Sequence, residues 1–184
     1  MKTDLTLKIT PQMTKDAQGN ERKALTGHLG THFDVMDKEF PLDYTELPGI
    51  VFDVEEIRDR EIGSSDIDMS KVRKGMFIAF HTHYLEDTGY GTRPYFKEHP
   101  QLSKELIVKL VSIGVAIIGI DAAGVRRGAE HTPADQYAAD HGVFIIENLC
   151  SLKLVAGKEA LFHTYPMNFS GMTGLPCRVV AELP

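Results

Sequence analysis

The sequence predicts an α/β fold, a single domain over residues 1–184 with a mixed central sheet. The second half of the chain alternates between short apolar runs and stretches with helical periodicity, a pattern typical of strands and helices in turn. The apolar runs are nearly continuous in Ile and Val, as in strands buried on both faces of a parallel sheet. A chain of 184 residues is long enough to bury one such core.

The individual elements follow from signals at their ends. Ser103 is a suitable N-cap for one helix, and Gly114 lies just past its end. Thr132 as N-cap and Pro133 in the first turn mark the start of a second helix. Their alternation with strands predicts parallel pairing with right-handed crossovers. Predicted strands cover residues 5–9, 27–36, 50–54, 76–82, 115–121, 143–148, 160–166 and 178–183, and predicted helices cover 103–114 and 132–142.

Composition and charge narrow the class of protein. Hydrophobic residues make up 42% and charged residues 25% of the chain, which is ordinary for a globular protein. A net charge of −6 argues against a nucleic-acid surface, and no apolar run is long enough for a membrane span. The N-terminus lacks the apolar core of a signal peptide, and Cys150 and Cys177 suit free thiols. We therefore expect a cytoplasmic protein that binds neither nucleic acid nor membrane.

The segment GHLGTHFDVMDKEF, residues 27–40, carries the strongest functional signal. Side chains alternate between faces in an extended chain, so His28, His32 and Asp34 would share one face. Two imidazoles and a carboxylate suit Zn, Mn, Fe or Co, and three protein ligands leave a coordination position open for water. The alternative is a pair of surface histidines beside a solvated aspartate. The opposite face would be suited to the core, with Leu29, Thr31, Phe33 and Val35.

The same residues carry a resemblance to a known family. HLGTHFD (28–34) resembles the HxGTHxDxPxH signature of the cyclase family of metal-dependent hydrolases, which includes bacterial kynurenine formamidases and isatin hydrolase. Further segments resemble landmarks of that family along nearly the whole chain: DLTLKI (4–9), YGTRPYFKEHPQLS (90–103), IGIDAAGV (118–125), HGVFIIENL (141–149) and GMTGLPCRVVAEL (171–183). The resemblance implies a fold of the swivelling β/β/α type and one or two metal ions, with Zn or Mn expected. It also implies a small-molecule substrate and a homodimer or homotetramer.

Carried over residue by residue, the resemblance assigns ligands for two ions. His28, His32 and Asp34 match the ligands of the first ion, and Asp34 can bridge to a second. Glu147 matches a glutamate ligand of that second ion, at the end of a strand where α/β sites form. The alternative for Glu147 is an ion pair with a basic side chain at the end of the sheet.

This chain departs from the signature at two positions, where Met36 and Lys38 replace a proline and a histidine. That histidine is the usual general acid/base of the family. Lys38 would share the ligand face by alternation, but its pKa would have to fall well below about 10 before it could act as a base. Lys38 is also interpretable as a solvated lysine or as a cation that holds an anionic substrate.

A second departure lies twelve residues before Glu147, where the family has a histidine ligand and this chain has Asp135. The carboxylate of Asp135 has a structural explanation as the third residue of a helix capped by Thr132. It can also act as an oxygen ligand, and a second site made only of carboxylates would favour Mn²⁺ or Mg²⁺. Nearby His131 is a substitute ligand if the loop shifts.

Two further segments contain candidates for the missing roles. His81 and His83 follow a predicted strand, and an imidazole there could shuttle a proton without a large change in pKa. We assign His83 to catalysis and His81 to the substrate pocket; the alternative is two polar residues at a strand end. Tyr90, Arg93 and Tyr95 lie in a glycine-rich stretch that could form a pocket wall.

Together these features predict metal-assisted hydrolysis of an amide, lactone or cyclic imide by metal-activated water. Lys38 or His83 would manage the proton of the leaving group. One alternative is a family member that binds metal but has lost catalysis and serves as a binding or scaffolding protein. Another is a metal-dependent dehydratase or isomerase.

Overall fold

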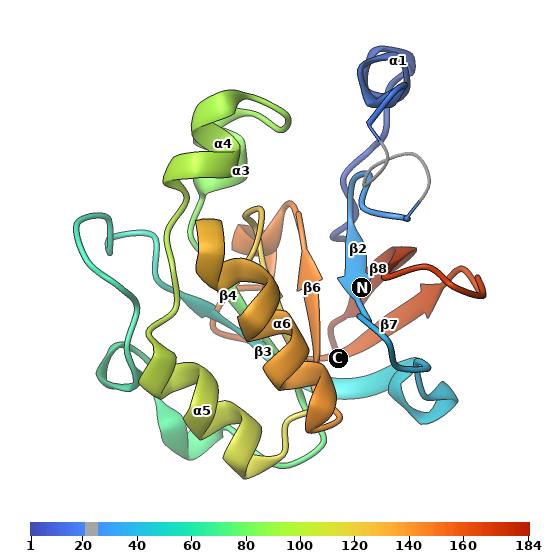
Figure 1. Ribbon diagram of the computed structural model, residues 1–184. Coiled ribbons are helices and arrows are strands. Elements are labelled where there is room, and N and C mark those ends of the chain that lie inside the picture. The colour runs from blue at the N-terminus through green and yellow to red at the C-terminus, as the bar shows by residue number, and fades with distance from the viewer. Residues whose placement is uncertain (21–25) are drawn as a thin grey trace.

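The protein is described from a computed structural model, which places residues 1–20 and 26–184 (Figure 1). One eight-stranded sheet runs through the chain in the order β1-β8-β2-β6-β5-β4-β3-β7, and β7 also pairs with β8. All strands except β1 therefore form a closed ring. The strands are β1 (Lys2–Asp4), β2 (His32–Asp34), β3 (Glu46–Asp53), β4 (Phe77–His81), β5 (Ile117–Ile120), β6 (Phe144–Glu147), β7 (Glu159–Pro166) and β8 (Gly174–Glu182).

The sheet is mixed, as the sequence predicts. Strands β3, β4, β5 and β6 are parallel to one another, whereas β1, β2, β7 and β8 form only antiparallel pairs. The Ile and Val runs of the parallel strands are buried on both faces, which confirms the prediction from their composition. Adjacent residues of β4 show this directly, because Ile78 and Phe80 pack into one core and Phe77 and Ala79 into another.

Helices cover one face of the parallel strands and extend beyond their carboxyl ends. Figure 1 shows α5 and α6 on this face, with α3 and α4 near one end. Leu106, Leu110 and Ala138 from α5 and α6 are buried in the core beneath them, and each large apolar side chain contributes about 1.5–3 kcal/mol. The helices are α1 (Pro11–Ala17), α3 (Tyr84–Thr88), α4 (Arg93–Glu98), α5 (Lys104–Ile113) and α6 (His131–Asp140).

The two predicted helices differ in how well their ends were anticipated. Ser103 accepts a hydrogen bond from the backbone of Leu106, and Gly114 closes α5 at a φ of 79°, as predicted. The prediction that Thr132 caps α6 is wrong, because the helix already begins at His131 and Glu130 is its N-cap. A capping motif read from sequence cannot detect that the preceding 3₁₀ turn, Gly128–Glu130, extends directly into the helix.

The first half of the chain departs most from the predicted strands. The strand predicted at 5–9 is β1 at Lys2–Asp4, and the strand predicted at 27–36 shrinks to the three residues of β2. Gly30 and Met36 have φ values of 72° and 56°, and such left-handed backbone interrupts an extended chain on both sides of β2. The two chain ends lie together, since the amino group of Met1 donates to the carbonyl of Leu183 at 2.9 Å.

None of the helices within residues 1–20 and 26–184 has both the length and the apolar character needed to cross a bilayer. Cys150 and Cys177 are free thiols, as expected. Burial raises the pKa of both, which favours the protonated form.

Candidate metal centre

Titratable side chains stand at the carboxyl ends of four neighbouring parallel strands. In the sheet order β6, β5, β4 and β3 they are Glu147, Asp121, His81 and Asp53, where Asp121 directly follows its strand. This edge of a parallel sheet is where ligand sites form in α/β proteins. The antiparallel strand β2 lies on the other side of β6 and aligns His32 with Glu147.

His28, His32 and Asp34 converge as the sequence predicts, although the route of the chain differs. One ligand atom from each lies within 4.8 Å of the others. Nε2 of His28 is 3.1 Å and Nε2 of His32 is 3.7 Å from Oδ1 of Asp34. His32 and Asp34 share one face of β2, whereas His28 reaches the same point through the turn at Gly30 rather than by strand alternation.

A second group of ligand atoms shares Asp34 with the first. Asp34, His131, Asp135 and Glu147 each offer one atom within 4.8 Å of the others. His131 opens α6 and Asp135 follows one helical turn later, so both project from the same face. Nε2 of His131 lies 3.3 Å from Oδ2 of Asp135 and 3.5 Å from Oε1 of Glu147. This second group therefore combines the imidazole of His131 with three carboxylates, whereas the second site considered from the sequence contained carboxylates alone.

The same geometry removes the structural explanation for Asp135. It is the fifth residue of α6 rather than the third, and it is almost completely buried. Gly124 makes room for the imidazole of His131, because a β-carbon at Gly124 would stand 2.5 Å from Nδ1 of that ring. The packing around α6 thus places both side chains against the carboxyl end of β6.

Each of the three imidazoles has its Nδ1 atom held by a neighbouring group. Nδ1 of His32 is 2.8 Å from the carbonyl of Gly30, and Nδ1 of His131 is 3.2 Å from the carbonyl of Arg126. Nδ1 of His28 is 3.0 Å from Oγ1 of Thr26. When Nδ1 donates to a carbonyl, the lone pair stays on Nε2, which in all three rings is the nitrogen that faces the carboxylates.

Asn148 and two tyrosines brace the turn that carries His32. The Asn148 amide donates to the Gly30 carbonyl at 2.9 Å, and the Tyr95 hydroxyl donates to Oδ1 of Asn148 at 2.7 Å. The N–H of Gly30 donates to the Tyr90 hydroxyl at 3.0 Å. Asn148 was missed in the sequence, where its position directly after Glu147 was the available signal. Its φ of 57° turns the side chain back toward Gly30.

The electrostatics of the first group suit a cation. Burial raises the pKa of Asp34, but the charges and hydrogen bonds of His32 and His28 outweigh that effect and hold it well below its usual range. Nε2 of His32 and Oδ2 of Asp34 are buried and, within the described residues, have no hydrogen-bond partner. Buried polar atoms normally have partners, so these two atoms fit the role of ligands to a divalent ion.

A cavity of about 250 Å³ opens onto these groups. Tyr90, Phe96 and Ala123 form part of its wall, and His28, His32, His131 and Glu147 form another part together with Asn20 and Asn148. One part of the cavity wall is aromatic and another part carries the metal-ligating side chains, an arrangement that suits a small molecule. The predicted place of Tyr90 in the pocket wall agrees with this arrangement.

The structure places the other predicted site residues away from this cavity. The prediction that Lys38 shares a face with the metal ligands is wrong. The left-handed backbone of Met36 redirects the chain, and Nζ of Lys38 lies 2.8 Å from Oδ1 of Asp140. The hydrogen bonds to Asp140 and Asp37 raise the pKa of Lys38, the opposite of what a base requires. Tyr95 is fully buried beneath the wall, and Arg93 is exposed on α4.

His81 and His83 also lie outside the cavity lining, beside Asp53, Glu55 and Asp87 at the ends of β3 and β4. His83 is thus not among the residues that line this cavity, and its role in proton transfer stays a prediction. The two histidines form a separate group with Glu55.

The fold and these ligand groups define the class: a mixed α/β protein with a candidate centre for divalent cations at the carboxyl edge of its parallel strands. Residues 3–127 match the family described as “Putative cyclase”, and the chain belongs to this cyclase family. The resemblance seen in the HLGTHFD motif is thereby confirmed. Among curated proteins, no sequence matches this chain.

Solved structures share the fold along nearly the full length. A potential metal-dependent hydrolase with cyclase activity superposes with a TM-score of 0.78 and 23% identity, over 98% of this chain and 96% of the other. A predicted metal-dependent hydrolase from Bacillus stearothermophilus gives 0.75 and 22%, over 98% and 97%. Isatin hydrolase A from Labrenzia aggregata, bound to benzyl benzoate, gives 0.76 and 18%, over 100% and 93%. These likenesses confirm the expected cyclase-like fold class.

Proposed function

We propose that this chain is a metal-dependent hydrolase of a small amide, lactone or cyclic imide. The observation that carries the proposal is the pair of ligand groups that share Asp34 and open onto one cavity. The hydrolases with the same fold support it. We further propose that the chain acts on small molecules as a homodimer or homotetramer, as family resemblance implies.

One ion would be held by His28, His32 and Asp34. A second ion would be held by Asp34 together with His131, Asp135 and Glu147. We propose Zn or Mn, since both sets mix imidazole with carboxylate. A divalent ion bound there polarises a carbonyl and supplies a water acidified toward neutral pH.

The cavity residues would orient the substrate against these groups. Burial raises the pKa of Tyr90, so its hydroxyl, which accepts from the N–H of Gly30, stays protonated in the wall of the cavity. The Glu147 carboxylate lies 3.7 Å from Nε2 of His32 and 3.5 Å from Nε2 of His131, where it would help to hold the second ion. Phe96 and Ala123 would contact the apolar part of the substrate and exclude water.

A second candidate is a cation-binding protein without turnover. One observation favours it: the signature histidine is replaced by Lys38, whose side chain is paired with Asp140 away from the cavity. This candidate predicts bound metal without hydrolysis.

Metal analysis and a substrate panel separate the two candidates. Purified protein would be loaded with Zn²⁺ or Mn²⁺ and assayed on formamides, lactones and cyclic imides, alongside His32→Ala. His163→Gln is a matched control, because His163 pairs with Glu182 on β8, apart from both ligand groups. Turnover that His32→Ala abolishes and His163→Gln preserves supports the hydrolase. Stoichiometric metal without turnover on any substrate contradicts it and supports the binder.

A further inference from the structure

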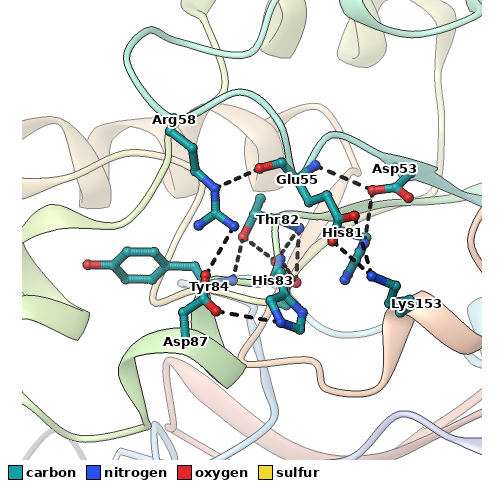
Figure 2. Close-up of polar contacts among 10 residues, drawn as sticks. Asp53, Glu55, Arg58, His81, Thr82, His83, Tyr84, Asp87 and Lys153 are labelled. Atoms are coloured by element: carbon teal, nitrogen blue, oxygen red, sulfur yellow. Dashed lines mark hydrogen bonds and ion pairs between the residues drawn. The ribbon is translucent and has the colours of Figure 1, made fainter.

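Glu55, His81 and His83 form another group of ligand atoms, at the carboxyl ends of β3 and β4. One ligand atom from each lies within 4.8 Å of the others. Figure 2 shows the two imidazoles and Glu55 together, with Lys153 and Asp87 nearby. None of the three lines the cavity at the candidate metal centre, and β5 separates β4 from β6 in the sheet.

The orientation of His81 is the observation that points to a ligand. Its side chain is fully buried, and its Nδ1 lies 3.0 Å from Oδ1 of Asp53. Its Nε2 is also buried and has no hydrogen-bond partner in the part of the chain that the structure describes. A carboxylate that fixes Nδ1 and leaves Nε2 for a cation is the arrangement found behind histidine ligands of metals.

His83 adopts a conformation that is unusual for its residue type. Its φ of 61° lies in the left-handed region, where a side chain other than that of glycine is strained. Asp121 holds this turn, accepting from the backbone N–H of His83 at 2.8 Å and from the Thr82 hydroxyl at 2.6 Å. In this conformation the centroid of the His83 ring lies 5.7 Å from the centroid of the His81 ring.

The charges around Glu55, His81 and His83 favour the binding of a cation, although the ammonium group of Lys153 competes for the Glu55 carboxylate. Three carboxylates, those of Asp53, Glu55 and Asp87, face two basic side chains, Lys153 and Arg58. Nζ of Lys153 lies 3.3 Å from Oε2 of Glu55, but the lysine side chain is 62% exposed. Exposed ion pairs of this kind are weak, so an arriving ion can displace the ammonium into solvent.

We propose that Glu55, His81 and His83 bind a separate divalent cation of the Zn²⁺ class, with the remaining coordination position open to solvent. Two imidazoles and one carboxylate are a frequent protein ligand set for Zn²⁺. The cation fixes the junction between β4 and α3, from which the chain continues to Tyr90 and Tyr95 at the main centre. The inference is independent of the proposed hydrolysis.

His83→Gly is the sharpest test, because it deletes a ligand and relieves the left-handed strain at once. Zinc per chain would be measured after equilibrium dialysis against Zn²⁺, with thermal unfolding recorded in parallel. We expect His83→Gly to bind one ion fewer than the wild type while remaining at least as stable. Glu55→Gln gives a second variant, at a partly buried position, with the same expected loss of one ion. His163→Gln should bind as the wild type does.

Two further variants test the geometry rather than the ligand count. Lys153→Gln removes the competing ammonium and should tighten Zn²⁺ binding at this group, whereas Asp53→Asn should weaken it by ~10–100-fold through the orientation of His81. Equal zinc content and affinity in the wild type, His83→Gly and Glu55→Gln would overturn the proposal. So would a zinc-soaked crystal whose anomalous signal appears only at the main centre.

Discussion

The groups around Asp34 and around Glu55 stand on the same edge of one sheet but differ in enclosure. At the Asp34 centre, the side chains of Asp34, His32 and Glu147 are at most 6% exposed, and carbonyl oxygens hold Nδ1 of His32 and His131. At the Glu55 group, the side chains of Glu55 and His83 are 24% and 35% exposed. The difference predicts that the Asp34 centre binds metal more tightly, because its ligands are fixed and poorly solvated before the ion arrives.

The comparison also shows how such a centre is distinguished from an ordinary cluster of charges. Glu55 is paired with the lysine of a neighbouring turn, so its charge is already neutralised in part. Asp34 is buried between imidazoles, and no lysine or arginine pairs with it among the described residues. Burying a carboxylate that has no lysine or arginine partner is costly, and a bound cation offsets that cost. This is the clearest physical sign of function in the molecule.

The largest expected effect is that of Asp34→Asn, since both ligand groups at the main centre contain Asp34. The variant keeps the shape of the side chain but removes its charge. We expect metal affinity at this centre to fall by more than ~100-fold, beyond the range for residues that only orient ligands, with loss of any hydrolysis. Zinc content after dialysis tests this, and retention of the ion at the Glu55 group serves as the internal control. Unchanged zinc content would contradict the assignment.

His131→Gln should remove only part of the main centre. We expect metal content there to fall from two ions to one, because His28, His32 and Asp34 remain intact. Metal content and rate should be measured on the same sample across pH. Retention of two ions with a slower rate and an altered pH profile would instead assign His131 to proton transfer.

His99 is a useful contrast to His32, because a backbone carbonyl also holds its Nδ1. It belongs to none of the three ligand groups found among the described residues. Burial lowers the pKa of His99 from 6.5 to about 4. Above pH 6.5 the ring is neutral in both states. Below it the unfolded chain takes up the proton first, so the folded protein loses up to about 3 kcal/mol of stability between pH 6.5 and 4.

His99→Asn, which cannot titrate in this range, should lack that contribution. Urea unfolding at pH 7 and pH 4.5 would show a smaller pH-dependent loss in the variant than in the wild type. Parallel stability curves for the two proteins would refute the prediction, and zinc binding at both groups should be unchanged.

The smallest expected effect is that of Tyr95→Phe, which leaves Oδ1 of Asn148 without its donor. We expect a loss of about 1–2 kcal/mol in the free energy of unfolding, and no more than a ~10-fold decrease in metal affinity at the Asp34 centre. Tyr84→Phe is the matched control, because the Tyr84 hydroxyl donates to the carbonyl of Pro94 at an exposed position. An equal effect from both substitutions would show that Asn148 does not support the centre.

Different parts of the structure were predictable to different degrees. The parallel strands and α5 were anticipated because residues buried on both faces and caps such as Ser103 are local signals. The strand at 27–36 was overestimated, since local alternation does not reveal the left-handed turns at Gly30 and Met36. The same turns explain why Lys38 was wrongly placed on the ligand face, and why Asn148, which braces Gly30 from β6, was missed.

The sequence by itself determined the cyclase family, the mixed α/β fold and the imidazole–carboxylate character of residues 28–34, because these depend on composition and short spacing. Only the tertiary structure decided which distant side chains complete the centre. His131 and Asp135 face Glu147 because α6 begins one residue before its predicted cap and packs against the end of β6. Likewise, His81 meets Glu55 because parallel strands place their carboxyl ends side by side, a proximity that no local pattern encodes.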